Sequence, residues 1–173
     1  YDRLKVDDER FLDVLLAARQ SGALVCVHAE NHGMISWMSR KLVEKGFVAP
    51  KYHAMSHPRL AETEAFTRLI ALVRGADAAF TNIEMLFHDF EMYPMNESGG
   101  TYMRAEPALA KDLAWAGFDL GSLANNHTGD YGVAGMRLTQ KYVAEAGILA
   151  AGVGQSLVEA REAKFLETAK GRV

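Results

Sequence analysis

Apolar and polar residues follow two periods along the chain, and together they predict alternating helices and strands. Where apolar residues recur three and four positions apart we expect helices, and where they form short uninterrupted runs we expect buried strands. The predicted helices are 6–22, 35–46, 60–74, 106–116, 133–145 and 157–163, and the predicted strands are 23–27, 78–83, 118–124, 148–152 and 165–168. This order indicates an α/β fold with a mainly parallel sheet and covering helices.

The stretches 47–58 and 85–103 follow neither period and predict loops. The second is rich in Met, Tyr, Asn and Gly, and its length is typical of a functional loop. We expect it on the substrate side of the fold.

The strand predicted over 118–124 ends in a cluster of small polar residues, Asn125 to Asp130, and a helix begins near Val133. In open α/β sheets, ligands bind at the carboxyl ends of the strands. An asparagine carbonyl beside an imidazole can ligate a metal ion, and the histidine can give a proton to a leaving group. The same cluster is typical of a turn whose side chains cap the next helix. Residue spacing alone leaves both interpretations open.

Composition narrows the class of protein. The 173 residues suit one domain of ordinary size, and 49% hydrophobic with 24% charged residues is typical of a globular protein. A formal net charge of −3 gives no electrostatic reason to expect nucleic acid or an anionic membrane as a partner. The single cysteine, Cys26, lies in an apolar run and is expected in the core, where it forms no internal disulfide.

No apolar run approaches the ~18 residues that a transmembrane helix needs, and no signal peptide pattern follows Tyr1. A cytoplasmic location is therefore the default expectation, with no transmembrane segment in this chain. The start at Tyr1 and the end at Val173 suggest a fragment of a longer protein.

His28 lies directly after the apolar run 23–27, at the carboxyl end of a predicted strand. In (β/α)-barrel enzymes this position places metal ligands. A histidine that hydrogen-bonds a neighbouring carbonyl group at a strand end fits the same position. His28 is therefore a candidate metal ligand with a simpler structural alternative.

The stretch from Leu123 to Gly132 has the sequence LANNHTGDYG. Three further segments accompany it in order, namely 76–84, which ends in Asn-Ile-Glu, the helix 109–119, and 146–161. Together these four segments resemble the CapA family of capsule and poly-γ-glutamate synthesis proteins, which have a metallophosphatase-like fold. The resemblance covers about 64–173 and implies an incomplete metallophosphatase-like domain, because the family's opening Gly-Asp-x-Met strand has no counterpart here.

This resemblance assigns roles to individual residues. It makes Asn126 and Glu84 metal ligands, and it makes His127 the proton donor or transition-state stabiliser, oriented by Asp130. The implied substrate-binding groups are Asn82 and Asn125. Calcineurin-like phosphoesterases hold two divalent ions, here expected to be Mn or Zn, but about half of that ligand set is absent, so weak or no catalysis is expected. A strand-end carboxylate that faces water is the simpler alternative for Glu84.

The first part of the chain contains three further segments of interest, 6–30, 41–46 and 50–58. In this order they resemble a second family, the dihydropyrimidinase and hydantoinase group of amidohydrolases, over about 1–60. The histidine of the family's Val-His-Ala-Glu-Asn stretch is one ligand of a two-metal centre, which implies a metal-binding role for His28. The family's His-x-His pair and carboxylated lysine have no counterpart here, and one ligand does not hold such a centre.

The two resemblances predict the domain organisation. A (β/α)-barrel-like βα fragment of the hydantoinase type is expected over 1–60, a shared joining helix over 61–75, and a truncated CapA-like domain over 76–173. No linker rich in Gly, Ser or Pro separates the parts, so we infer a recombined or artificially joined chain.

Three functions follow as hypotheses. The first is a CapA-like protein of capsule or poly-γ-glutamate synthesis with a metal-dependent phosphoesterase-type site. The second is an amidohydrolase remnant related to cyclic amide hydrolysis, and the third is a non-catalytic chimeric or pseudogene product. The expected partners are a small molecule or an anionic polymer as substrate. A second copy of the chain is a further expected partner, because an unfinished sheet leaves an edge that can pair.

Overall fold

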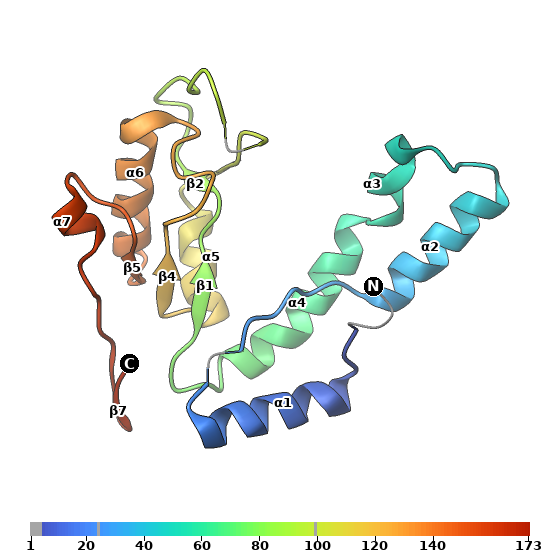
Figure 1. Ribbon diagram of the computed structural model, residues 1–173, viewed down its shortest axis with the longest axis horizontal. Coiled ribbons are helices and arrows are strands. Elements are labelled where there is room, and N and C mark those ends of the chain that lie inside the picture. The colour runs from blue at the N-terminus through green and yellow to red at the C-terminus, as the bar shows by residue number, and fades with distance from the viewer. Residues whose placement is uncertain (1–4, 24, 99) are drawn as a thin grey trace. The chain divides into compact units, whose positions relative to one another are not determined.

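The computed structural model describes residues 5–23, 25–98 and 100–173. The chain divides into two units, Tyr1–Leu69 and Ile70–Val173 (Figure 1). Helix α4 (Arg59–Val73) confirms the helix predicted over 60–74, and the boundary between the units falls inside it.

The first unit is helical in the part that the structure describes. Its elements are α1 (Asp8–Ser21), α2 (His32–Glu44), the 3-10 helix η1 (Pro50–Tyr52), α3 (His53–Ser56) and the first part of α4. Side-chain caps explain where the two long helices begin, because the Asp7 carboxylate accepts from the Arg10 amide and the Asn31 side chain accepts from the Met34 amide. The predicted loop 47–58 is partly wrong, since η1 and α3 lie within it.

The strand predicted over 23–27 is wrong. Leu24 lies outside the described residues, and the other residues of the stretch form no strand. Cys26 is exposed rather than in the core, and Val27 is exposed as well. A barrel strand is stable between neighbouring strands, and the described part of this unit contains none with which it could pair. Residues 23–27 therefore do not form the predicted βα fragment.

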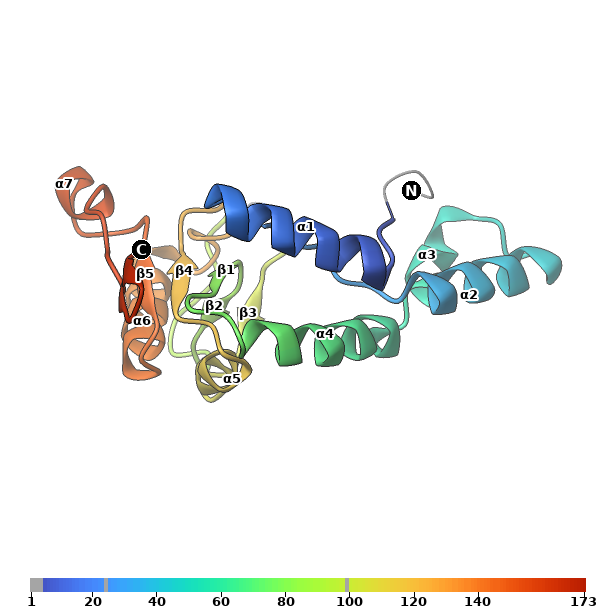
Figure 2. The same ribbon diagram turned by 90° about the horizontal axis from the view of Figure 1, so that it is seen from below.

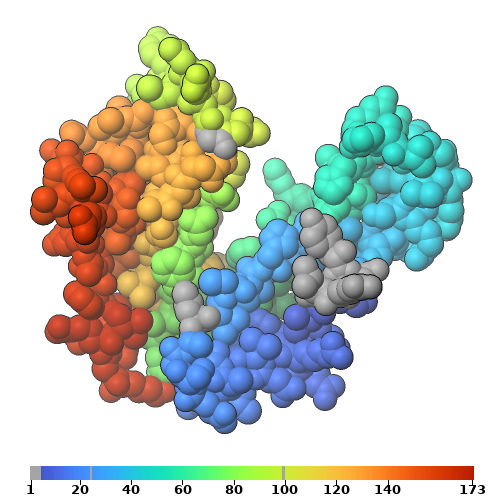
Figure 3. Space-filling model, in the orientation of Figure 1, coloured from blue at the N-terminus to red at the C-terminus, as the bar shows by residue number. Residues whose placement is uncertain are grey.

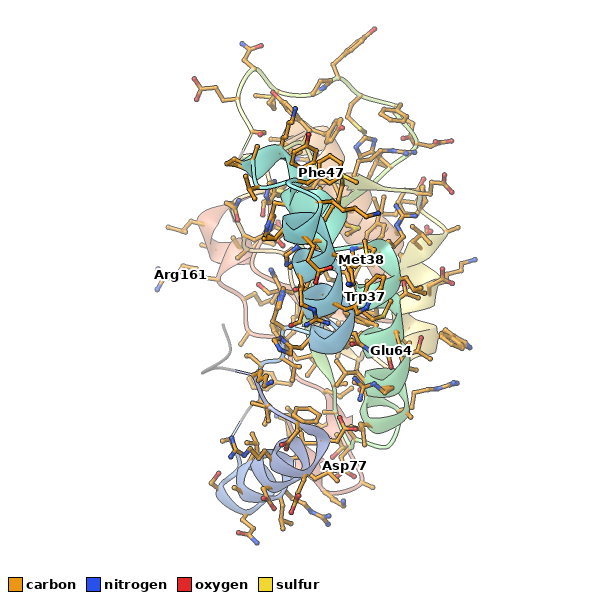
Figure 4. The ribbon with its side chains drawn as sticks, turned by 90° about the vertical axis from the view of Figure 1, so that its right-hand side faces the viewer. Trp37, Met38, Phe47, Glu64, Asp77 and Arg161 are labelled. Carbon is orange, nitrogen blue, oxygen red and sulfur yellow. The ribbon has the colours of Figure 1, made fainter. Side chains whose placement is uncertain are left out.

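Polar contacts connect the helices of the first unit. Asn31 donates through its backbone amide to the Ala61 carbonyl (2.9 Å) and through its side chain to the Glu64 carboxylate (2.5 Å). Figure 4 shows Glu64 on α4 and Trp37 on α2. Helix α4 buries Ala61 and Ala65, whereas α1 buries none of its residues. The first unit thus has little apolar core among its described residues.

A parallel sheet forms the centre of the second unit, in the order β1–β4–β5. Its strands are β1 (Phe80–Asn82), β4 (Leu120–Ser122) and β5 (Leu149–Ala151). Helices α5 (Leu109–Ala116) and α6 (Gly132–Glu145) connect them and contact each other, so both cover the same face of the sheet (Figure 2). The predicted α/β fold with a parallel sheet is confirmed in this unit.

The core of the second unit lies between this sheet and α5 and α6. Its buried members are Ile83, Phe87, Ala105, Ala110, Leu123, Val143, Ile148 and Val153. Gly121, in the middle of β4, allows Ile83 to enter the core, since a Cβ atom on Gly121 would lie 2.6 Å from the Ile83 Cδ1 atom. A side chain at this point of the central strand would therefore force Ile83 to move.

A second pair of parallel strands, β2 (Leu86–Phe87) and β3 (Arg104–Ala105), brackets the long stretch between them. The prediction of an unpatterned loop over 85–103 is wrong at its start, where β2 lies. Thr139 on α6 fixes β2, because its hydroxyl accepts a hydrogen bond from the buried Phe87 amide (2.9 Å). The stretch between the two strands projects at one end of the second unit (Figure 3).

The end of the chain forms the short helix α7 (Leu157–Ala160) and a hairpin of β6 (Glu167–Thr168) and β7 (Gly171–Arg172). Asp77, labelled in Figure 4, accepts from the Lys170 ammonium group (2.7 Å), which ties this hairpin to the segment before β1. Among the described helices, none is long and apolar enough to cross a membrane.

Candidate functional site

The turn after β4 is closed by its own side chains. Asn125 Oδ1 accepts from the His127 amide (3.0 Å), and Asn125 Nδ2 donates to the Ile83 carbonyl (2.9 Å), just past the end of β1. The Thr128 hydroxyl accepts from the Asn125 amide (3.1 Å). The Asn125 side-chain oxygen thus closes the turn, and its side-chain nitrogen holds the turn against the segment after β1. The substrate-binding role of Asn125 stays a prediction.

This turn does not serve mainly to cap the next helix. The residue that precedes α6 is Tyr131, and no side chain donates or accepts a capping hydrogen bond there. The simpler alternative for the cluster is therefore only half right, since its side chains stabilise the turn rather than α6.

His127 and Asp130 form a buried pair in this turn. The His127 Nδ1 atom lies 2.9 Å from Asp130 Oδ2, and the two side chains are 10% and 0% exposed. The same carboxylate oxygen accepts a hydrogen bond from the Met103 amide (2.7 Å), at the end of the long loop. Because Asp130 engages Nδ1, Nε2 is the ring nitrogen left to meet a ligand. The arrangement holds one tautomer of His127.

The far end of the loop 88–103 borders the imidazole. A Cβ atom placed on Gly100 would lie 3.8 Å from His127 Cε1, so the backbone passes close to the ring. The Met95 amide donates to the Asp130 carbonyl (2.9 Å), which fixes a second point of the loop on the same turn. The expectation that this loop lies beside the site agrees with these contacts.

His88 follows β2 and is fully buried, which the sequence did not indicate. Its Nδ1 atom accepts from the Phe90 amide (3.1 Å), and its ring lies against that of Tyr131 with centroids 4.1 Å apart. Its Nε2 atom has no hydrogen-bond partner among the residues that the structure describes. Burial lowers the pKa of His88, and the nearby Arg104 guanidinium lowers it further. The only signal in the sequence is the position of His88 after the apolar pair Leu86 and Phe87.

Glu91 is the second group of this loop with a shifted pKa. Hydrogen bonds from the backbone amides of Glu91 and Asp89 lower the pKa of the Glu91 carboxyl. Its carboxylate therefore stays ionised near His88, where it partly offsets the effect of Arg104.

The remaining predicted site residues fall into two groups. Asn82, Glu84 and Asn126 belong to the carboxyl ends of the adjacent strands β1 and β4, the edge that also carries His127. Asn82 and Asn126 are exposed, and Glu84 is half-buried. His28 belongs to the first unit, where its side chain is 88% exposed and its Nε2 atom lies 3.3 Å from Glu30.

The described residues do not assemble the two-metal centre that the resemblance implies. Among them, no three His, Cys, Asp or Glu side chains are grouped as metal ligands. Asp130 already accepts bonds from His127 and Met103, which leaves Glu84 and Asn126 as the predicted oxygen donors. We therefore derive no step through a metal ion, and binding of Mn or Zn stays a prediction.

Comparison with known proteins gives relatives of two kinds. The uncharacterized proteins y4sH and y4uA of Sinorhizobium fredii are each 43% identical over 111 residues, which is 62% of this chain and 24% of theirs. D-phenylhydantoinase of Escherichia coli is 39% identical over 75 residues, which is 43% of this chain and 16% of that protein. The chain thus spans about a quarter of the length of the first relatives. The matched shares of this chain, 62% and 43%, together exceed its full length, so the two matches overlap.

A family model also matches the chain. The family is described as bacterial capsule synthesis protein PGA_cap, and the match covers residues 47–173. It begins before residue 64, where the motifs alone placed the start of the resemblance, and it contains both His127 and Asp130. Since this match covers more than half of the residues, the chain belongs to the bacterial capsule synthesis protein family PGA_cap.

Proposed function

We propose that this chain carries the proton-transfer part of a phosphoesterase-type site that acts on an anionic polymer, or on its precursor, in capsule synthesis. The single observation that supports the proposal is the buried hydrogen bond between His127 Nδ1 and Asp130 Oδ2 at 2.9 Å. Poly-γ-glutamate is the polymer that the resemblance suggests. Because this polymer contains amide bonds and no phosphoester, the bond that is cleaved would belong to a phosphorylated precursor.

The proposed step uses the Nε2 atom of His127. When a phosphoester P–O bond breaks and water supplies the new oxygen on phosphorus, the leaving oxygen takes a proton from the protonated imidazole. The Asp130 carboxylate engages Nδ1 and keeps Nε2 directed outward. A positioned acid of this kind typically contributes about 10²–10⁴ in rate.

The test is hydrolysis of bis(p-nitrophenyl) phosphate by the whole chain, with Mn²⁺, with Zn²⁺ and with EDTA. We expect His127→Gln to lose at least about tenfold of the rate, since a general acid is removed. His53→Gln, on an exposed histidine, is the matched control. An unchanged rate in His127→Gln, or no hydrolysis by the parent chain, would refute the phosphoesterase step.

The same hydrolysis experiment tests the predicted metal ligands Glu84 and Asn126. Dependence on Mn²⁺ or Zn²⁺ that weakens in Glu84→Gln and in Asn126→Ala would support these two residues as ligands. Equal metal dependence in both variants and in the parent chain would argue against them.

Binding of poly-γ-glutamate, measured by calorimetry, tests the polymer separately. We expect heat of binding with the parent chain and weaker binding with Asn126→Ala. Neutral dextran of similar length is the control polymer. If poly-γ-glutamate and dextran behave alike, the polymer assignment is wrong even where hydrolysis is observed.

The similarity to D-phenylhydantoinase supports a second candidate, hydrolysis of a cyclic amide with His28 as a metal ligand. The exposed position of His28 and the missing strand before it argue against this candidate. Hydantoin opening that disappears in His28→Gln would favour it over the capsule-related site. A chain inactive in every assay would instead be the non-catalytic product.

A further inference from the structure

Arg104 is held in place by three consecutive residues, 88–90, that directly follow β2. Its Nε atom donates to the His88 carbonyl (2.9 Å), and an Nη2 atom donates to the Asp89 carboxylate (2.8 Å). Its guanidinium carbon lies 4.0 Å from the centre of the Phe90 ring, a distance typical of a cation–π contact. The Arg104 side chain is only 17% exposed, although its partners Asp89 and Phe90 are exposed.

These contacts close a strand pair that is too short to be stable alone. Strands β2 and β3 share two residue pairs, with hydrogen bonds from the Leu86 amide to the Met103 carbonyl and from the His88 amide to the Ala105 carbonyl, both 3.2 Å. A two-stranded pair of this length is marginal without support from side chains. Arg104 supplies that support, because it joins β3 to the residues that follow β2.

The strand pair leads directly to the His127 site. Met103, the residue before Arg104, donates its amide to Asp130 Oδ2 (2.7 Å), and the same oxygen meets His127 Nδ1 (2.9 Å). The position of the Met103 amide therefore depends on where β3 lies. The Arg104 guanidinium is thus connected through the Met103 peptide group to the Asp130 carboxylate and the His127 imidazole.

His88 strengthens the same arrangement. It is fully buried, and its carbonyl accepts the hydrogen bond from the Arg104 guanidinium. Its ring contacts Tyr131, which directly follows Asp130. Both ends of the loop 88–103 thus contact the turn that carries His127 and Asp130.

We propose that Arg104 is a positioning residue for His127, acting through the Met103 amide and Asp130. Without the guanidinium, β3 separates from residues 88–90 and the Met103 amide leaves Asp130. The carboxylate then turns away from His127, and the hydrogen bond that holds the proton on Nδ1 is lost. The consequence for catalysis rests on the proposed function, whereas the consequence for the imidazole does not.

The test reads which ring nitrogen of His127 carries the proton, by long-range ¹H–¹⁵N correlation spectra of the whole chain at a pH where the ring is neutral. The nitrogen that carries the proton is set by the hydrogen bond that it makes. We expect the proton on Nδ1 in the parent chain and a mixture of both tautomers in Arg104→Met. In Arg104→Lys we expect a smaller change, since one ammonium group can replace part of the contacts.

Arg137→Met, on an exposed arginine of α6, is the matched control and should leave the proton on Nδ1. The His127 signals are assigned by their loss in His127→Gln. Unchanged Val143 methyl signals show that the core of the second unit is intact in each variant. If Arg104→Met disrupts the Val143 methyl signals, the His127 tautomer is compared between the parent chain and Arg104→Lys instead.

An unchanged tautomer in the intact Arg104 variants overturns the proposal, as does an equal change in Arg137→Met. A proton on Nε2 in the parent chain overturns it as well. A tautomer change without any hydrolysis by the parent chain supports the positioning role and refutes only the phosphoesterase step.

Discussion

Among single residues, Asp130 is the one on which the geometry of the site depends. Its carboxylate is fully buried and accepts from His127 and from the Met103 amide. Hydrogen bonds to an ionised acceptor are roughly twice as strong as those between neutral groups. The charge on Asp130 therefore fixes both the imidazole and the end of the loop.

We expect Asp130→Asn to destabilise the second unit by about 1–3 kcal/mol, because an amide accepts more weakly and brings an NH₂ group into a buried position. The measurement is urea unfolding followed by Trp115 fluorescence in a Trp37→Phe background. The control, Asp77→Asn, removes an exposed ion pair and should cost less than about 1 kcal/mol. Equal losses in the two variants would contradict the prediction.

His88 should make the stability of the second unit depend on pH. Burial and Arg104 lower its folded pKa below the usual value of about 6.5, while Asp89 and Glu91 act in the opposite direction. A lowered histidine pKa means that the unfolded chain takes up the proton first. Stability is therefore full above about pH 6.5 and falls as the pH drops below that value.

Thermal melts between pH 8 and pH 5 test this dependence. We expect the melting temperature of the second unit to fall with pH more steeply in the parent chain than in His88→Gln, which cannot be protonated. His57→Gln, on a histidine outside the second unit, should keep the parent slope. Parallel curves for the parent chain and His88→Gln would show that His88 does not titrate in this range.

The sequence predicted part of the site because short-range chemistry decides that part. Asp130 is three residues from His127, so a turn brings them together without help from the rest of the fold. The Met103 amide and the burial of His88 depend on a strand pair joined across the loop, which no local pattern encodes. Those contacts were therefore missed.

Among the elements, the strongly periodic helices were predicted well and the shortest strands were not. Helices α1, α2, α5 and α6 lie where the apolar period placed them, within a few residues at their ends. Strands β2 and β3 contain only two residues each, which is too short to show alternation. The stretch 23–27 shows the opposite error, because an apolar run forms a strand only when a partner strand is present.

Thr139 joins α6 to β2 and should be costly to remove. Its hydroxyl accepts from the Phe87 amide (2.9 Å) and donates to the Gly135 carbonyl (2.8 Å). We expect Thr139→Val to destabilise the second unit by about 1–3 kcal/mol, since the buried amide loses its acceptor. Thr139→Ser keeps the hydroxyl and should cost less. Urea unfolding measures both, and a larger loss in Thr139→Ser would show that the methyl group matters more.

For the whole chain, the two units should differ in resistance to proteolysis. Helix α1 buries no residue, whereas α6 buries Gly135, Thr139 and Val143. Local opening costs little where few apolar contacts are lost, and proteases cut at such openings. We expect brief trypsin treatment to cut α1 and α2 first, at Arg10, Arg19, Arg40 and Lys41.

Mass spectrometry of the first fragments checks this order. Lys111, Arg137 and Lys141 are the internal controls, because they are exposed trypsin sites in the second unit. First cuts at any of these would contradict the prediction. A surviving fragment that starts within or after α4 would agree with a second unit stable by itself.

The parallel order β1–β4–β5 determines when the sheet can form during synthesis. Parallel neighbours cannot be joined by a tight turn, so each strand waits until a whole helix has been made. Phe80 meets Leu120 only after α5, and Leu120 meets Leu149 only after α6. A ribosome that has made β1 but not β4 therefore presents Ile83 without the core that later covers it. The nascent chain should need chaperone protection most in that interval, and should lose that need once β5 has emerged.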